Sequence, residues 1–176
     1  MKHLSKFIPQ FAGIALLAAS PMLFAQDSAN RLSNPDSTFA MKAAQANMAE
    51  IQMGQLASQN GSSADVKSFG QKMVTDHTKA NDELKSIASK KSVTLPTGVS
   101  AKDQAAYDKV SKLTGAEFDK EFMAEMVNGH KEAVSLFQKE ATSGTDPDLK
   151  SYASSTLPTI QQHLEMAQSD EMKLKK

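Results

Sequence analysis

The sequence contains no cysteine among its 176 residues, and this absence excludes several kinds of site. A chain without cysteine has no disulfide, no thiolate nucleophile, no lipid-modified cysteine and no cysteine-based zinc site. Its stability must therefore come from the packing of a core. The chain also lacks a nucleophile elbow, a phosphate-binding loop and a dinucleotide-binding glycine pattern, so hydrolase and nucleotide-dependent activities have no support.

Long runs of charge of one sign are absent as well. The full chain has 20 basic and 20 acidic residues, spread along its length. Nothing in this distribution predicts nucleic acid or an anionic membrane surface as a partner. The partner and the oligomeric state are therefore unknown from the sequence.

The first 25 residues are typical of a secretory signal peptide. Lys2 and Lys6 precede an apolar stretch that ends at Ala25, the expected cleavage site. Its removal leaves 18 basic and 20 acidic residues, a net charge of −2. Because Leu23 is larger than a cleavage site prefers, an uncleaved membrane anchor is the alternative. The pattern predicts an exported protein of the periplasm, with outer-membrane association as a further option.

Four segments of the remaining chain repeat apolar residues at the helical period. Signals for their starts lie near Asp36, Ser63, Thr114 and Asp146, and Thr114 opens a capping-box pattern with Glu117. Each segment is about 26 to 28 residues long, or roughly 40 Å as a helix. Residues 92–113 form a connection, with a short helix, that is long enough to cross a bundle. We predict an all-α four-helix bundle over residues 36–173, after a flexible segment at 26–35.

A polar residue lies near the middle of the apolar stripe of each predicted long helix. These residues are Glu50, His77, His130 and His163. Measured along the helices from the two predicted hairpin turns, they lie within roughly one helical turn of the same level. If a stripe covers about a third of a helix, three independent histidines would all face inward about one time in 27. The sequence therefore predicts a cluster of four polar side chains in the core.

This cluster has three interpretations. Three neutral imidazoles and the Glu50 carboxylate can bind one zinc, iron, copper or manganese ion, with Asp76 as a partner that supports a ligand. Alternatively, Glu50 bonded to a protonated histidine forms a buried polar network that fixes the helix register without chemistry. A third interpretation is a histidine switch that responds to pH.

Four short motifs, taken together, resemble a known family. They are Met73-Val74-Thr75-Asp76-His77, Gly115-Ala116-Glu117-Phe118-Asp119, Met126-Val127-Asn128-Gly129-His130, and Leu157-Pro158 with His163-Leu164. This set is similar to a widespread family of small exported bacterial proteins of unknown function, with a ferritin-like four-helix fold and often an outer-membrane label. The likeness covers residues 36–168. It implies a ferritin-like bundle in the bacterial envelope and implies no activity.

The sequence departs from the ferritin-like enzymes, which hold two irons with Glu-x-x-His motifs on two helices. Val74, Val127 and Ile160 stand three residues before the histidines, so a standard di-iron oxidase is not expected. We predict an exported envelope protein whose core binds one transition metal ion, and no catalytic residues. The alternative is a structural, interaction or stress-related periplasmic protein with a metal-free polar network.

Overall fold

The computed structural model describes residues 32–175, so the predicted signal peptide (1–25) lies outside the described residues. Within that range the chain forms five helices and no strand. This confirms the predicted all-α class. In the same range, no helix combines the length and apolar character needed to cross a membrane. The helices are α2 (Asn34–Asn60), α3 (Ala64–Lys90), α4 (Ala101–Val110), α5 (Gly115–Ser143) and α6 (Pro147–Leu174).

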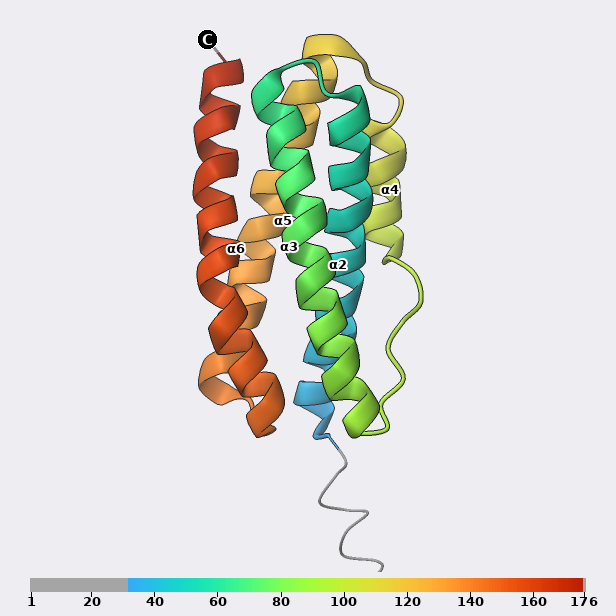
Figure 1. Ribbon diagram of the computed structural model, residues 1–176, viewed down its shortest axis with the longest axis vertical. Coiled ribbons are helices and arrows are strands. Elements are labelled where there is room, and N and C mark those ends of the chain that lie inside the picture. The colour runs from blue at the N-terminus through green and yellow to red at the C-terminus, as the bar shows by residue number, and fades with distance from the viewer. Residues whose placement is uncertain (1–31, 176) are drawn as a thin grey trace, which may run out of the picture. The chain divides into compact units, whose positions relative to one another are not determined.

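The four long helices pack as two hairpins, α2 with α3 and α5 with α6. The hairpins contact each other through α2 with α5 and through α3 with α6. After α3 the chain returns to the opposite end of the bundle and forms α4 on the way, next to α2 and α5 (Figure 1). Because of this crossover, α3 and α5 run in the same direction, a point that the length of the connection had left open.

Three of the predicted helix starts carry side-chain caps, and one does not. The Ser33 side chain accepts a hydrogen bond from the backbone of Asp36, Ser63 caps α3, and Asp146 caps α6. The predicted capping box at Thr114 is wrong, because the Thr114 side chain makes no capping hydrogen bond. The physical reason is Gly115, the first residue of α5, whose φ of 59° is left-handed and so departs from the backbone path that a capping box requires.

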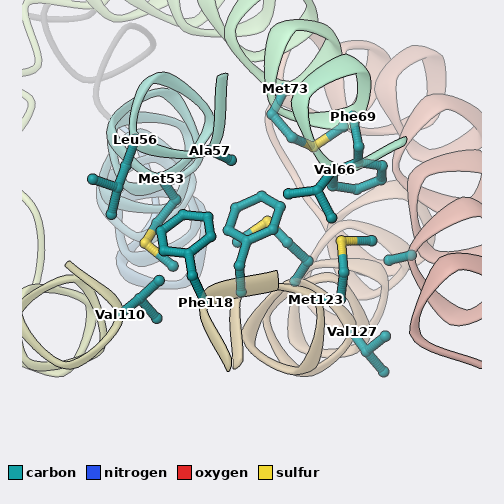
Figure 2. Packing of buried hydrophobic residues seen from close by; sticks show 13 residues of the cluster. Met53, Leu56, Ala57, Val66, Phe69, Met73, Val110, Phe118, Met123 and Val127 are labelled. Atoms are coloured by element: carbon teal, nitrogen blue, oxygen red, sulfur yellow. The ribbon is translucent and has the colours of Figure 1, made fainter. Parts of the chain in front are cut away.

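Two apolar clusters fill the interior of the bundle. The first joins the α2–α3 turn region to the start of α5, and Val110 of α4 packs against it (Figure 2). The second lies toward the other end and includes Phe39, Phe137 and Tyr152, with the rings of Phe39 and Phe137 5.1 Å apart. Along every long helix, the residues of the two clusters are separated by a buried polar position. A polar layer therefore divides the core.

Two glycines allow α2 and α3 to approach closely. A Cβ on Gly70 would lie 2.7 Å from the Gly54 carbonyl oxygen, and a Cβ on Gly54 would lie 2.6 Å from the Gly70 carbonyl oxygen. Both distances are shorter than a van der Waals contact, so a side chain at either position forces the two helix backbones apart.

We expect Gly70→Ala to lower the free energy of unfolding by about 1–2 kcal/mol, because the cost of overpacking exceeds the helix propensity that alanine adds. Urea denaturation of the purified protein measures this change. The matched control is Gly98→Ala in the connection, where nothing lies within 4 Å of the added Cβ. If Gly70→Ala and Gly98→Ala had the same free energy of unfolding, the close approach of α2 and α3 would contribute nothing to stability.

Candidate metal centre

The polar layer brings three histidines from three helices together. His77 of α3, His130 of α5 and His163 of α6 are buried, with 6%, 0% and 1% of their surface exposed. Their ring centroids lie 5.4 to 5.8 Å apart. One ring nitrogen from each histidine lies within 4.8 Å of the other two. The structure therefore places the three predicted histidines at one level, as their spacing from the turns indicated.

The hydrogen bonds of His130 and His163 fix which ring nitrogen carries the proton. Nδ1 of His130 lies 2.8 Å from the carbonyl oxygen of Met126, in the preceding helical turn. Nε2 of His163 lies 2.8 Å from a carboxylate oxygen of Asp76. A carbonyl and a carboxylate only accept hydrogen bonds, so both nitrogens must donate. In the neutral rings, the lone pairs are consequently on Nε2 of His130 and Nδ1 of His163.

Hydrogen bonds that run from Tyr152 through Asn47 fix which nitrogen of His77 carries the proton. The amide nitrogen of Asn47 lies 3.1 Å from the Tyr152 hydroxyl, and the Asn47 carbonyl oxygen lies 2.9 Å from Nδ1 of His77. With the Asn47 amide in this orientation, its oxygen accepts and Nδ1 of His77 donates. The lone pair of His77 is then on Nε2.

The three nitrogens with lone pairs have no hydrogen-bond partner among the described residues. They are the buried Nε2 of His77, Nε2 of His130 and Nδ1 of His163. Each unsatisfied buried polar atom costs about 1–3 kcal/mol. The three acceptors cannot satisfy one another, and a water molecule has only two hydrogens to donate. A metal cation can accept all three lone pairs at once.

Burial keeps the rings of His77 and His163 in the neutral form that binds metal. Burial is the main reason that the pKa of His77 is well below its ordinary value, and the nearby His130 and His163 lower it further. Burial also lowers the pKa of His163 to about 4, against the opposing effect of the hydrogen bond to Asp76. Both rings are therefore neutral at neutral pH, which argues against a histidine switch in that range.

Asp76 holds the His163 ring in its orientation. Burial alone would raise the pKa of Asp76, but hydrogen bonds from Lys72 and His163 outweigh that effect and lower the pKa. Lys72 lies 3.0 Å from the same carboxylate. The anionic Asp76 therefore fixes the tautomer of His163, in the arrangement in which carboxylates support metal-binding histidines.

Glu50 lies beside the three histidines and does not join their group. Its Oε1 is 3.6 Å from Nδ1 of His130, the nitrogen that already donates to Met126, and not the nitrogen that carries the lone pair. Its Oε2 is buried and has no hydrogen-bond partner among residues 32–175. Burial raises the pKa of Glu50, His130 opposes the rise, and Asp103 adds to it.

Sequence reasoning missed Asn47, which orients His77. Asn47 is 2% exposed and belongs to the same face of α2 as Glu50, three residues earlier. Its position on the apolar stripe was a signal that could have identified it. The carbonyl of Met126, which orients His130, is backbone and carries no signal in the sequence beyond its place four residues before the histidine.

Comparisons with known proteins identify a family without an assigned activity. Residues 21–169 match the family described as a domain of unknown function, DUF4142, and the chain belongs to this family. A crystal structure of a DUF305 fragment from Deinococcus radiodurans is similar in fold, with a TM-score of 0.73 and 10% sequence identity over 81% of this chain and 99% of that chain. No curated protein matches the chain. The expected membership of a family of unknown function is confirmed, and none of these comparisons carries a ferritin-like or outer-membrane label.

Proposed function

We propose that this member of the DUF4142 family binds one divalent transition metal ion in its core, through Nε2 of His77, Nε2 of His130 and Nδ1 of His163. Two observations carry the proposal: one ring nitrogen of each histidine lies within 4.8 Å of the other two, and each ring has one buried nitrogen without a hydrogen-bond partner among the described residues. The other ring nitrogen of each histidine donates a hydrogen bond to an oxygen, as in metal-binding histidines. In this proposal Asp76 orients the ligand His163 through a hydrogen bond, and Glu50 lies next to the ligand His130.

The ligand set favours some of the four candidate ions over others. Imidazole nitrogen suits zinc, copper and iron, whereas manganese prefers carboxylate, carbonyl and water oxygen. The group contains three histidines and no carboxylate. We therefore rank zinc, copper and iron above manganese. Three protein ligands leave coordination positions for an exogenous ligand, as in zinc sites that bind a water or a substrate.

We also propose that residues 36–173 form a ferritin-like four-helix bundle and that the protein is exported. Two antiparallel hairpins and a crossover that makes α3 and α5 parallel support the first proposal. The segment that resembles a signal peptide, residues 1–25, supports export to the periplasm. Of the predicted flexible segment 26–35, residues 26–31 lie outside the described residues, and Asn34 and Pro35 belong to α2.

Metal analysis tests the proposed site. The protein is purified without an affinity tag, stripped with a chelator, incubated separately with zinc, copper and iron salts, and analysed by elemental mass spectrometry. We expect about one ion per chain in the wild type and background levels in His130→Ala, because two imidazoles bind far more weakly than three.

The control variant for metal analysis is Glu140→Gln, an isosteric change ten residues from His130 on the same helix, or about 15 Å away. It should retain the ion. Circular dichroism of each variant shows whether the helices are intact. If the folded wild type takes up none of the three metals, the site is a metal-free polar network and the protein belongs to the structural or interaction class.

A further inference from the structure

Two cavities border α4 beside the proposed metal centre, and we call the one that His77 and His130 help to line the inner cavity and the other the outer cavity. The inner cavity has a volume of about 330 Å³, and His77 and His130 form part of its wall. The outer cavity has a volume of about 430 Å³ and extends along α4 and α5. Both cavities are bordered by Ala49, Glu50, Lys102, Asp103, Gly129 and Glu132. The two spaces therefore adjoin, and the inner one reaches two of the histidines.

The walls of the outer cavity carry more negative than positive charge. Four acidic side chains line it, against two lysines, Lys102 and Lys131. Lys102 is paired with Glu132, and 68% and 66% of these two side chains are exposed, so this end faces solvent. Walls with an excess of carboxylates raise the local concentration of cations. The acidic residues are Glu50, Asp103, Glu125 and Glu132.

Glu50 is the carboxylate closest to the histidines on this path. Only 9% of its surface is exposed, and its buried Oε2 has no hydrogen-bond partner in the described part of the chain. Its other oxygen lies 3.6 Å from the His130 ring. A carboxylate oxygen is a ligand for divalent cations. Glu50 can therefore hold an ion at the boundary between the cavities and the histidines.

Gly129 keeps this boundary open. A Cβ at this position would lie 3.2 Å from Oε1 of Glu50 and would project where both cavities meet the carboxylate. A larger side chain would fill the path without replacing any proposed ligand. This gives a way to block the route that is independent of the charge of Glu50.

We propose that divalent metal ions reach the three histidines through these two cavities and that Glu50 is the transfer ligand, which binds the ion on its way in and out. This inference rests on the proposed metal centre. In this role Glu50 binds the ion transiently, so it affects the rates of loading and release more than the affinity at equilibrium. The route past Asp76, which is partly exposed and lies beside His163, is the competing path.

Loading kinetics of the full chain test the route. Zn²⁺ is mixed with the metal-free protein in a stopped-flow instrument with a fluorescent zinc indicator, and release is followed by transfer to a chelator. We expect Glu50→Gln and Gly129→Val each to slow loading and release about tenfold or more, with Kd unchanged, because they remove the attracting charge or fill the path. The control Glu165→Gln changes a carboxylate that borders a different cavity, next to α3 and α6, and should keep both rates.

Three results are distinguishable. Wild-type rates in both Glu50→Gln and Gly129→Val overturn the route, and the metal centre stands. Faster release with a weaker Kd in Glu50→Gln overturns the transfer role, because Glu50 would then be a resident ligand. No zinc uptake by the folded wild type overturns the metal centre itself. Glu50→Gln preserves the shape of the side chain, so the test does not depend on Gly129→Val folding well.

Discussion

Saturating zinc should raise the melting temperature of the metal-free protein by about 10 °C. A ligand that binds only the folded state stabilises it by about 4 kcal/mol at a concentration 1,000 times its Kd. In a domain of this size, each 1 kcal/mol shifts the melting temperature by about 2–4 °C. Part of the gain comes from supplying a partner to three buried lone pairs that have none among the described residues. Differential scanning fluorimetry with and without zinc measures the shift.

The pH dependence of this stabilisation by zinc follows from the protonation state of the histidine rings. Because burial lowers the pKa of His163 to about 4 and that of His77 well below its ordinary value, protons do not compete with metal for these nitrogens at neutral pH. The zinc-induced shift should therefore persist down to about pH 6. In His163→Ala it should disappear. An equal shift in that variant and in the wild type would place the zinc at another site and contradict the proposed ligands.

The level of each polar residue along the bundle is predictable from the sequence, and its orientation is not. The two hairpin turns fix how far each residue lies along its helix, so helical geometry alone places His77, His130 and His163 together. Their rotation about the helix axis is known from the apolar stripe only to about a third of a turn. The stripe therefore does not fix the direction of the Glu50 carboxylate, which the structure places 3.6 Å from Nδ1 of His130.

Other features of the structure depend on contacts that a sequence pattern does not contain. The connection from 92 to 113 is long enough for either direction of α5, and only the packing of α4 against α2 and α5 decides it. The pattern at Thr114 matched a capping box, but the left-handed backbone of Gly115 removed the cap. Asn47 was overlooked because a lone amide on an apolar stripe has no meaning until its partners, Tyr152 and His77, are known.

Glu140→Gln should stabilise the protein at pH 8 and have little effect at pH 5. Glu140 is 5% exposed, and its pKa is raised to about 7 by burial first, and then by the nearby Asp36, with which it shares a hydrogen bond, and by Asp146. Asp36 is itself buried and accepts hydrogen bonds from Thr145 and from the backbone of Asp146. Two carboxyl groups thus meet at the α5–α6 turn, and the proton on Glu140 relieves their repulsion.

The sign of the effect follows from proton binding. The folded state binds the Glu140 proton more tightly than the unfolded state, whose pKa is near the ordinary 4.5. The stability that this proton contributes is complete below about pH 4.5 and is lost as the pH rises through about 7. Allowing for solvent screening, the loss is on the order of 2 kcal/mol. Glutamine keeps the shape and the donor and cannot lose a proton, so the variant avoids this loss.

The difference between variant and wild type is the quantity to measure, because the wild type alone contains an opposing effect. His77 and His163 have lowered pKa values in the folded state, so they destabilise the protein as the pH falls below about 6.5. That contribution is the same in both proteins and cancels in the difference. Urea denaturation of the metal-free proteins at pH 5 and pH 8 gives four free energies of unfolding. If Glu140→Gln is no more stable than the wild type at pH 8, the ionised Glu140 does not lower the free energy of unfolding, and the prediction is wrong.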